Sequence, residues 1–497
     1  MVRTVQPEAV GRPSRPRPGP VAVGVVLAVV AYCLVWLPLF SDQAVMASIG
    51  RDVVGGRHLY TEILDAKQPG MHLWYGAITF LLGPHQPVYQ LFSVLAALGA
   101  AALLTRLLVD RLGPGRVRTW APVLVAGGVL LTLDEFHLGQ AELVALVPGV
   151  GALALVAGRT GGAQPSPRRA LLAGGCLGVV VVLKALLVAV PGAAVLAYVL
   201  VAERPGRVRA VAVLAVGGLL APTAVVLWLA AAGDLPAALH AWFTYPSQVL
   251  ALADVRSPEE LIGAGRRFLL LFAGVGVLAL WRLRTVLRDR DPLDVALVAW
   301  CVLGVAVYAV QVWWHYYLLV LVPGLVGLAV RQLDDLSRRS GRARRIGLPA
   351  VALLTVPMVV YGLLGAGLVL RDGGGLTAAS RDAVAARVAD YDEIRAELAA
   401  VDLRPGDALQ VFGDARYQLL ADRPYALSTN GWSAEFVPPQ RWELIGRELE
   451  ERRPEMVLVS DLAAEAMRAR APAALAVLER RYAVVRTSAA GTWYRAS

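Results

Sequence analysis

The chain has little charge, little cysteine and almost no lysine. Charged residues make up 17% of its 497 positions and hydrophobic residues 57%, a balance that argues against an ordinary soluble domain. Cys33, Cys176 and Cys301 all lie within apolar runs, which argues against a disulfide framework or a metal-ligand pattern. Among 48 basic residues only Lys67 and Lys184 are lysines. The preference for arginine indicates a GC-rich genome, so we expect a bacterial source, and it singles out the two lysines.

Two further absences narrow the function. The sequence has no convincing internal repeat, and residues 371–497 contain neither a glycine-rich phosphate loop nor a nucleophile motif. The net charge of +10 does not indicate nucleic-acid binding, because the arginines cluster in short segments between apolar runs. That distribution is typical of cytoplasmic loops in membrane proteins.

Repeated apolar runs of about 20 residues predict a polytopic membrane protein. We predict eleven spans, at about 21–40, 87–109, 119–133, 141–158, 170–184, 186–202, 210–232, 268–281, 293–311, 316–331 and 347–370. The segment 71–83 is apolar and aromatic but short, which favours an interfacial or re-entrant position.

The arginines also predict the orientation. With a cytoplasmic N-terminus, the inside segments carry 23 arginines and the outside loops six basic residues, as the positive-inside rule requires. We therefore expect a multi-pass protein of the cytoplasmic membrane. It would have a basic cytoplasmic tail (1–19), a transmembrane domain (20–370) with an outer loop at 41–72, and an extracytoplasmic domain (371–497).

The composition changes after residue 371. Short apolar strands are predicted at 408–412, 456–459 and 482–485, between helices at 381–400 and 462–480. Alternating strands and helices predict a small α/β domain. We expect this domain to act as a lid or docking platform over the bundle.

The outer loop 41–72 carries most of the candidate chemistry. Its charged residues include four carboxylates and a lysine: Asp42, Asp52, Glu62, Asp65 and Lys67. A lysine is a compact point charge suited to a phosphate, and Asp42 lies at the water interface, where a carboxylate costs little. A solvated helix end and a snorkelling lysine are the alternatives for Asp42 and Lys67. Asp52 and Glu62 are better explained as solvated or structural.

Other candidates lie in later outer segments. The run from Asp134 to Glu142 holds three carboxylates and a histidine. These side chains suit the binding of a divalent cation or of a sugar hydroxyl. The alternative is a polar turn without a function. Lys184 lies among apolar residues at the outer end of a predicted span. It is either a functional group or an anchor at the membrane interface. The aromatic cluster at 313–317 fits an interfacial belt, but its histidine, His315, suits a phosphate or sugar.

Together these positions resemble a known family. The chain is similar to GT-C-fold glycosyltransferases of glycosyltransferase family 39, the protein O-mannosyltransferases and aminoarabinose transferases. The resemblance covers roughly 20–331. It rests on Ser41-Asp42-Gln43, on Gly55 to Tyr60 followed by Asp65-Ala66-Lys67-Gln68-Pro69 (a "G-x-x-x-Y … D-x-K-x-P" pattern), on Gly139-Gln140-Ala141-Glu142, and on His315-Tyr316-Tyr317-Leu318 before Pro323. Gln43, Gln68 and Gly70 depart from the usual residues.

This resemblance implies an all-α GT-C-like membrane enzyme with a small C-terminal α/β domain. It would move a sugar from a polyprenyl-phosphate donor to a hydroxyl of a glycan, lipid or protein acceptor of the cell envelope, among membrane lipids. Asp42 would be the catalytic base or a metal ligand, with Glu142 as a second catalytic carboxylate. Both could bind Mg²⁺ or Mn²⁺. Lys67 would neutralise the donor phosphate. Asp65, Lys184, His315 and Tyr316 would bind substrate.

Two other functions remain open from the residues. A transporter or flippase for a lipid-linked or polar substrate would need charged residues at mid-membrane and often repeats. A non-catalytic cell-envelope assembly protein would not need Asp42, Lys67 and Glu142 to converge. The enzyme hypothesis predicts that these three side chains line one outward-facing site.

Overall fold

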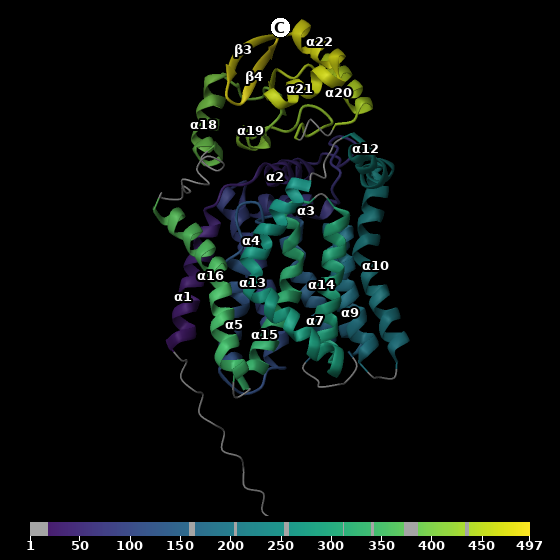
Figure 1. Cartoon of the computed structure of the whole chain (residues 1–497). Coiled ribbons are helices and arrows are strands. Elements are labelled where there is room, and N and C mark those ends of the chain that lie inside the picture. The colour runs from purple at the N-terminus through teal and green to yellow at the C-terminus, as the bar shows by residue number, and fades with distance from the viewer. Residues whose placement is uncertain are drawn as a thin grey trace, which may run out of the picture.

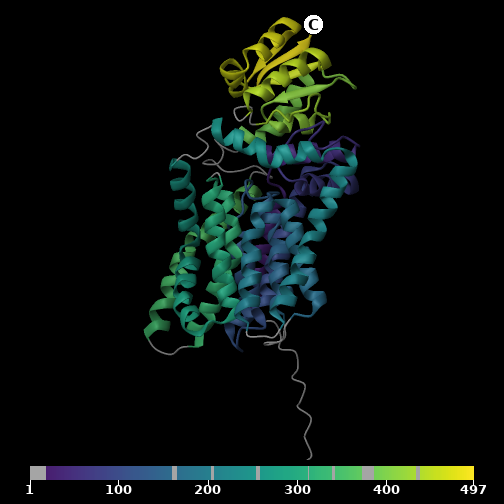
Figure 2. The ribbon, with the colours of Figure 1, turned by 90° about the vertical axis from the view of Figure 1, so that its right-hand side faces the viewer.

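The computed structural model describes residues 18–158, 165–202, 206–252, 258–311, 313–338, 342–371, 386–432 and 437–497. The predicted basic tail at 1–19 therefore lies almost entirely outside the described residues. The described chain forms a bundle of long helices with a smaller α/β domain stacked on one end (Figure 1), and the perpendicular view shows the same two layers (Figure 2).

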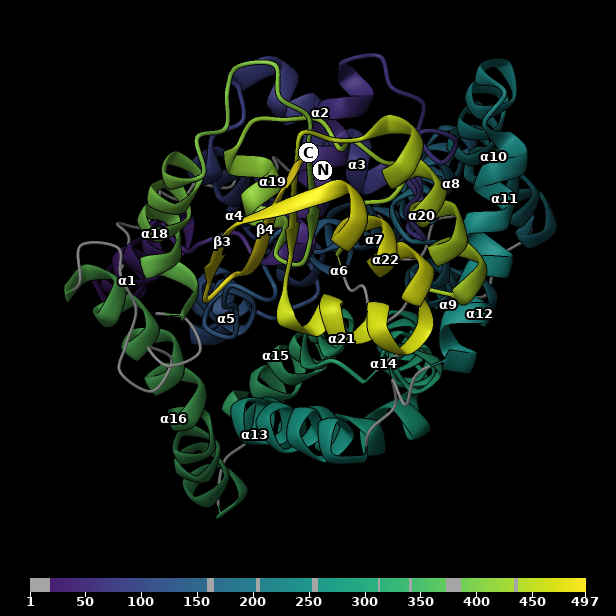
Figure 3. The same cartoon turned by 90° about the horizontal axis from the view of Figure 1, so that it is seen from above.

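Apolar helices build the bundle. They are α1 (Pro18–Val35), α4 (Gln86–Val109), α5 (Arg116–Leu130), α6 (Ala141–Val144), α7 (Leu146–Ala157), α8 (Pro167–Leu183), η1 (Ala185–Val188), α9 (Ala189–Val201), α10 (Arg207–Ala232), α13 (Pro258–Asp289), α14 (Pro292–Val310), η3 (His315–Leu321), α15 (Val322–Arg338) and α16 (Arg342–Arg371). A helix satisfies its own backbone polar groups, as lipid requires. From above, α13 and α16 lie at the edge of the bundle (Figure 3).

The prediction of a membrane protein is supported by helix length and composition. Seven helical segments in the described ranges are long and apolar enough to cross a membrane. Each of the eleven predicted spans coincides with a helix, but the remaining four are shorter or less apolar. The count of eleven therefore stays a prediction. The short connection predicted between the fifth and sixth spans is present, because α8 ends at Leu183 and η1 begins at Ala185.

The segment 41–72 is not the open loop that we expected. Its first 14 residues form α2 (Ser41–Val54), which lies at the end of the bundle that faces the α/β domain (Figure 1). Every residue from 42 to 50 is buried, including the polar Gln43 and Ser48, so packing on all sides stabilises this part of the helix. The following α3 (Pro69–Leu82) has 14 residues, about 21 Å, and is too short to span a bilayer, as predicted.

Helices α2 and α3 are in backbone contact at two glycines. A Cβ atom on Gly50 would lie 2.5 Å from the carbonyl oxygen of His72 and 2.7 Å from the backbone nitrogen of Gly76. We expect Gly50→Ala to lower the free energy of unfolding by about 1–3 kcal/mol, because backbone atoms cannot move aside as a side chain can. Thermal unfolding of the purified protein measures this. The control, Gly263→Ala in α13, adds a Cβ that meets no atom within 4 Å. Equal stability of both variants would contradict the close contact.

The C-terminal domain is a four-stranded sheet with helices. Its elements are α18 (Ala386–Ala400), β1 (Leu409–Phe412), α19 (Ala415–Leu420), α20 (Pro439–Arg452), β2 (Met456–Val459), α21 (Asp461–Arg470), α22 (Pro472–Arg481), β3 (Tyr482–Ser488) and β4 (Gly491–Ala496). The strand order is β1-β2-β4-β3, with β1 and β2 parallel and β4 antiparallel to both of its neighbours.

The sequence anticipated part of this domain. The structure contains the three predicted strands and adds β4, α19 and α20, which we did not predict. The single helix predicted at 462–480 was wrong, because it is two helices divided before Pro472. Proline lacks the backbone N–H that would continue the first helix.

The domain is held on the segment 41–72 by buried polar contacts. A carboxylate oxygen of Asp52 accepts a hydrogen bond from the backbone N–H of Tyr425 at 3.1 Å and lies 3.4 Å from the Arg57 guanidinium. The backbone N–H of Leu64 donates to the carbonyl of Ser428 at 3.0 Å. The structure thus gives Asp52 a structural role, and these contacts fix the domain against the mouth of the bundle.

Candidate active site

Lys67 joins two carboxylates at the contact between α2 and α3. Its ammonium nitrogen lies 2.9 Å from Oδ1 of Asp42 and 3.4 Å from the carboxylate of Asp65. The backbone N–H of Lys67 also donates to Asp65 at 3.0 Å. Asp42 lies in the first turn of α2 and Lys67 two residues before α3, so the packing of these helices brings the pair together. Asp42 and Asp65 are only 9% and 5% exposed.

The charged groups of this cluster favour one another's ionised forms. Burial opposes ionisation of Asp65, but the neighbouring Lys67 ammonium and His72 outweigh it and hold the pKa of Asp65 below its ordinary value. Burial likewise opposes the charge on Lys67, but Asp42 and Asp65 raise the pKa of Lys67. Both groups therefore stay charged at neutral pH.

The lowered pKa of Asp65 has a consequence for stability. A carboxyl group whose pKa is depressed by folding stabilises the protein above its unfolded pKa, about 3.9, and loses this contribution as the pH falls. We expect the thermal midpoint of the protein to drop below about pH 4, and the drop to be smaller in Asp65→Asn. Glu443→Gln, an exposed position on α20, should follow the unmodified protein. Identical pH profiles for both variants would contradict this role of Asp65.

The second lysine is paired in the same manner. Nζ of Lys184 lies 2.6 Å from Oε1 of Glu142 and 3.9 Å from the ring centre of Tyr317. Lys184 lies at the break between α8 and η1, and Glu142 lies in the short helix α6. Glu142 is 1% exposed, so its carboxylate depends on this ammonium, because an unpaired buried charge is costly.

The two lysine pairs are neighbours. A Cβ on Gly70 would lie 2.5 Å from the carbonyl oxygen of Val182, so the start of α3 is in contact with the end of α8. Tyr317 contacts Lys184 and is also close enough to Lys67 to raise the pKa of its ammonium group. Tyr316 packs edge-on against Tyr317, with 4.6 Å between ring centres. It also interacts electrostatically with the carboxylates of Asp42 and Glu142. The structure thus brings together the chain's two lysines.

A third polar cluster surrounds Asp134. Nδ1 of His137 lies 2.6 Å from its carboxylate, and the Tyr361 hydroxyl donates to it at 3.0 Å. The Arg267 guanidinium also donates to this carboxylate, and Nε2 of His315 lies 3.8 Å away. The sequence had no signal for Arg267 and Tyr361, because they come from α13 and α16, far along the chain. His315, predicted to bind substrate, belongs to this cluster.

The metal prediction can be compared with these contacts. The described group with the geometry of a metal site is Asp134, His137 and His315, whose ligand atoms lie within 4.8 Å of one another. Asp42 and Glu142 each contact a lysine ammonium instead. Although burial opposes ionisation, His137 and Arg267 hold the pKa of Asp134 well below its usual range, and the Arg267 guanidinium already pairs with this carboxylate.

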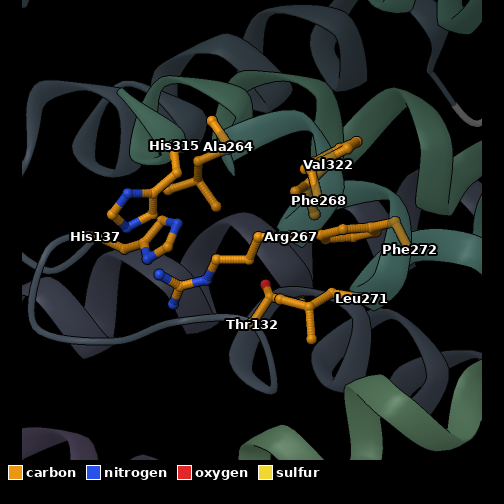
Figure 4. Close-up of a pocket in the computed structure, with 10 residues that line it drawn as sticks. Thr132, His137, Ala264, Arg267, Phe268, Leu271, Phe272, His315 and Val322 are labelled. Atoms are coloured by element: carbon orange, nitrogen blue, oxygen red, sulfur yellow. The ribbon is translucent and has the colours of Figure 1, made fainter. Parts of the chain in front are cut away.

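Two cavities flank this region. The first is small, about 20 Å³, and has a polar end with His137 and His315 and an apolar wall that includes Phe268 and Phe272 (Figure 4). The second, about 10 Å³, lies beside Glu142, with an apolar lining that includes Leu187, Trp300 and Val320.

Comparison with known proteins places the fold. No family model matches the sequence, and no curated protein sequence is significantly similar to it. The structure is similar to ArnT from Cupriavidus metallidurans, both in the apo state and bound to undecaprenyl phosphate. Each comparison has a TM-score of 0.63 and 16% identity and covers 95% of this chain and 97% of the other. It is also similar to the Archaeoglobus fulgidus oligosaccharyltransferase in complex with Zn and sulfate, with a TM-score of 0.52, 15% identity and coverage of 96% and 73%. The chain has the GT-C fold, as the sequence predicted.

Proposed function

We propose that this chain is a membrane glycosyltransferase that moves a sugar from a polyprenyl-phosphate donor to an acceptor hydroxyl. The GT-C fold supports a glycosyltransferase, and the undecaprenyl phosphate bound to ArnT supports a lipid-phosphate donor. The observation that carries the proposal is the 2.9 Å contact between Lys67 and Asp42. The arginine distribution supports a position of this site at the outer face of the cytoplasmic membrane.

The two side chains have complementary tasks. The acceptor oxygen attacks the anomeric carbon of the sugar, the bond from that carbon to the phosphate oxygen breaks, and polyprenyl phosphate leaves with the electron pair. Lys67 stabilises the negative charge that grows on the phosphate, and Asp42 takes the proton of the acceptor hydroxyl. Asp65 holds the lysine in place through its backbone and side-chain contacts.

Lys184 and Glu142 form the second part of the donor site. Lys184 supplies another ammonium for the phosphate, and Glu142 orients it across 2.6 Å. The small space beside Glu142 has apolar walls that include Leu187, Trp300 and Val320, and a polyprenyl chain would pack against these side chains once the space opens. We call this space, together with the two lysines, the donor compartment.

The carboxylates that could bind a divalent cation are paired with protein cations. The solved oligosaccharyltransferase is a complex with Zn, but in this chain ammonium groups contact Asp42 and Glu142, and a guanidinium contacts Asp134. A Mg²⁺ or Mn²⁺ ion at these carboxylates would have to displace a protein cation, so the residues present do not fit one. The Lys67 and Lys184 ammonium groups supply the positive charge instead.

The direct test uses purified full-length protein in lipid nanodiscs with undecaprenyl phosphate that carries a radiolabelled sugar. We expect the sugar to leave the lipid and unlabelled undecaprenyl phosphate to accumulate in the presence of a crude cell-envelope lipid and glycan fraction. A transporter would move the labelled lipid across a bilayer without cleaving it, and an assembly protein would do neither. Intact donor after prolonged incubation would overturn the proposal.

A further inference from the structure

The carbonyl oxygen of Lys67 is held by a buried tyrosine. The hydroxyl of Tyr60 donates to it at 2.8 Å, and the indole N–H of Trp242 donates to the same hydroxyl at 2.8 Å. The rings of Tyr60 and Trp242 pack edge-on, with 5.7 Å between their centres. Tyr60 is 3% exposed, and burial raises the pKa of its hydroxyl well above the ordinary value. The hydroxyl therefore keeps the proton that it donates.

The backbone on each side of this contact has an uncommon conformation. Tyr60 has a φ of +76°, in the left-handed region that residues with a side chain rarely adopt. Trp242 belongs to a π-helix, η2 (His240–Thr244), which lies between α11 (Leu235–Leu239) and α12 (Tyr245–Leu252). Single π-helical turns are rare and are frequently found at functional sites. A backbone like that of Tyr60 persists only where the surrounding structure holds it, and Trp242 is part of that structure.

The residues next to Tyr60 are tied to the same segment as Trp242. Nδ1 of His58 lies 3.2 Å from one carboxylate oxygen of Asp234, and the hydroxyl of Thr61 donates to the other. Asp234 is only 2% exposed and directly precedes α11. The segment therefore holds the turn around Tyr60 through Asp234 as well as through Trp242.

Lys67 is thereby fixed at both of its backbone groups. Its N–H donates to Asp65, and its carbonyl accepts from Tyr60. A lysine side chain is a flexible four-carbon stem, so the position of its ammonium group depends on where the backbone holds that stem. A group that stabilises charge in a transition state has to be in position before the reaction. The contact between Tyr60 and Lys67 therefore matters for chemistry as well as for folding.

We propose that Tyr60, supported by Trp242, is a positioning residue for Lys67 in the transfer reaction. It keeps the lysine backbone in the place from which the ammonium group reaches both Asp42 and the leaving phosphate, and it touches neither donor nor acceptor. This inference rests on the proposed function. It predicts that loss of the Tyr60 hydroxyl slows transfer only through Lys67.

Tyr60→Phe removes the hydroxyl and keeps the ring. We expect the turnover rate at saturating donor to fall about 10–100-fold, because small misplacements of a reacting group have effects of this size. Tyr198→Phe is the matched control. The Tyr198 hydroxyl also donates to a carbonyl, that of Ala157 at 3.1 Å, and also accepts a hydrogen bond, from Arg111 at 3.2 Å. Tyr198 lies toward the end of α9 that is farther from Lys184, so its variant should keep normal turnover per folded molecule.

A double variant separates positioning from a general loss of stability. In a Lys67→Gln background there is no ammonium group to position, so adding Tyr60→Phe should cause no further loss of transfer. An effect that does not pass through Lys67 would lower transfer by the same factor in both backgrounds, because independent effects add in free energy. Equal factors would therefore overturn the inference.

The two lysines of the chain permit a second test that does not need the reaction. Full-length protein in nanodiscs, labelled with ¹³C at lysine Cε, should give two lysine signals, which Lys184→Arg assigns. We expect Tyr60→Phe to shift the Lys67 signal and not the Lys184 signal, and Tyr198→Phe to shift neither. An unchanged Lys67 signal in Tyr60→Phe would contradict the inference.

Trp242→Phe is the second variant, for use if Tyr60→Phe does not fold. It keeps an aromatic ring against Tyr60 and removes the indole N–H, so it should shift the Lys67 signal, leave the Lys184 signal in place and slow transfer. If it changes neither the Lys67 signal nor transfer, the inference is wrong. Failure of the proposed function would look different, because the unmodified protein would then leave the donor intact while the Lys67 signal still responds to these variants.

Discussion

Replacing Lys67 by Gln should slow sugar transfer by about 10²–10³-fold, the loss typical of removing one group that stabilises developing negative charge. The leaving phosphate gains charge as the bond to the sugar breaks, and Lys67 is the ammonium 2.9 Å from the proposed base. Initial rates of undecaprenyl phosphate release from a labelled donor measure the effect. Lys67→Arg should retain part of the activity, because it keeps the charge but changes its shape.

A control is needed because Lys67 also neutralises buried carboxylates. Removing it leaves Asp42 and Asp65 without their shared cation, and an uncompensated buried charge is strongly destabilising. The double variant Lys67→Gln with Asp65→Asn removes one of these charges and should regain stability without regaining transfer. Transfer at the unmodified rate in the stable double variant would show that Lys67 does not act on the phosphate.

The second large effect concerns the base. Asp42→Asn should reduce the turnover rate by about 10²–10⁴-fold, the usual contribution of a positioned general base. The amide keeps the size of the carboxylate and can still accept a hydrogen bond from Lys67, so thermal stability should change little. The measurement is the single-turnover rate of transfer at saturating donor.

Asp52→Asn is the matched control for Asp42→Asn, because it makes the same chemical change ten residues later in the same helix. Asp52 accepts a hydrogen bond from Tyr425 and pairs with Arg57. We expect Asp52→Asn to lower the thermal midpoint and leave the turnover rate per folded molecule near normal. Normal turnover in Asp42→Asn, or equal turnover losses in both variants, would contradict the assignment of the base.

The arginines of the predicted cytoplasmic segments have more than one role. Arg282 and Arg331 were counted only as topology signals, but both guanidinium groups contact the buried carboxylate of Asp294. These contacts join α13, α14 and α15 at the end of the bundle away from the candidate site. The pattern along the chain predicts on which side such residues lie, whereas their pairing depends on how three helices pack.

The predictability of the site differs from residue to residue. Asp42, Lys67 and Glu142 could be selected from the sequence because rare charged residues stand out beside apolar runs. Arg267 and Tyr361 could not, because their meaning comes from one carboxylate, Asp134, which lies more than 130 residues earlier in the chain. The loop prediction for 41–72 failed because polar residues such as Asp42, Gln43 and Ser48 suggested exposure, whereas tertiary packing buries all of residues 42–50 in a helix.

The sequence by itself determined that this is a polytopic membrane protein with a separate α/β domain, because the length and apolarity of each run are local properties that lipid selects directly. It also selected the two lysines. Only the tertiary structure decided that Lys67 joins Asp42 to Asp65, that Lys184 pairs with Glu142, and that Arg267 and Tyr361 reach Asp134. Those relations depend on contacts between distant segments, which helix packing sets and no local pattern records.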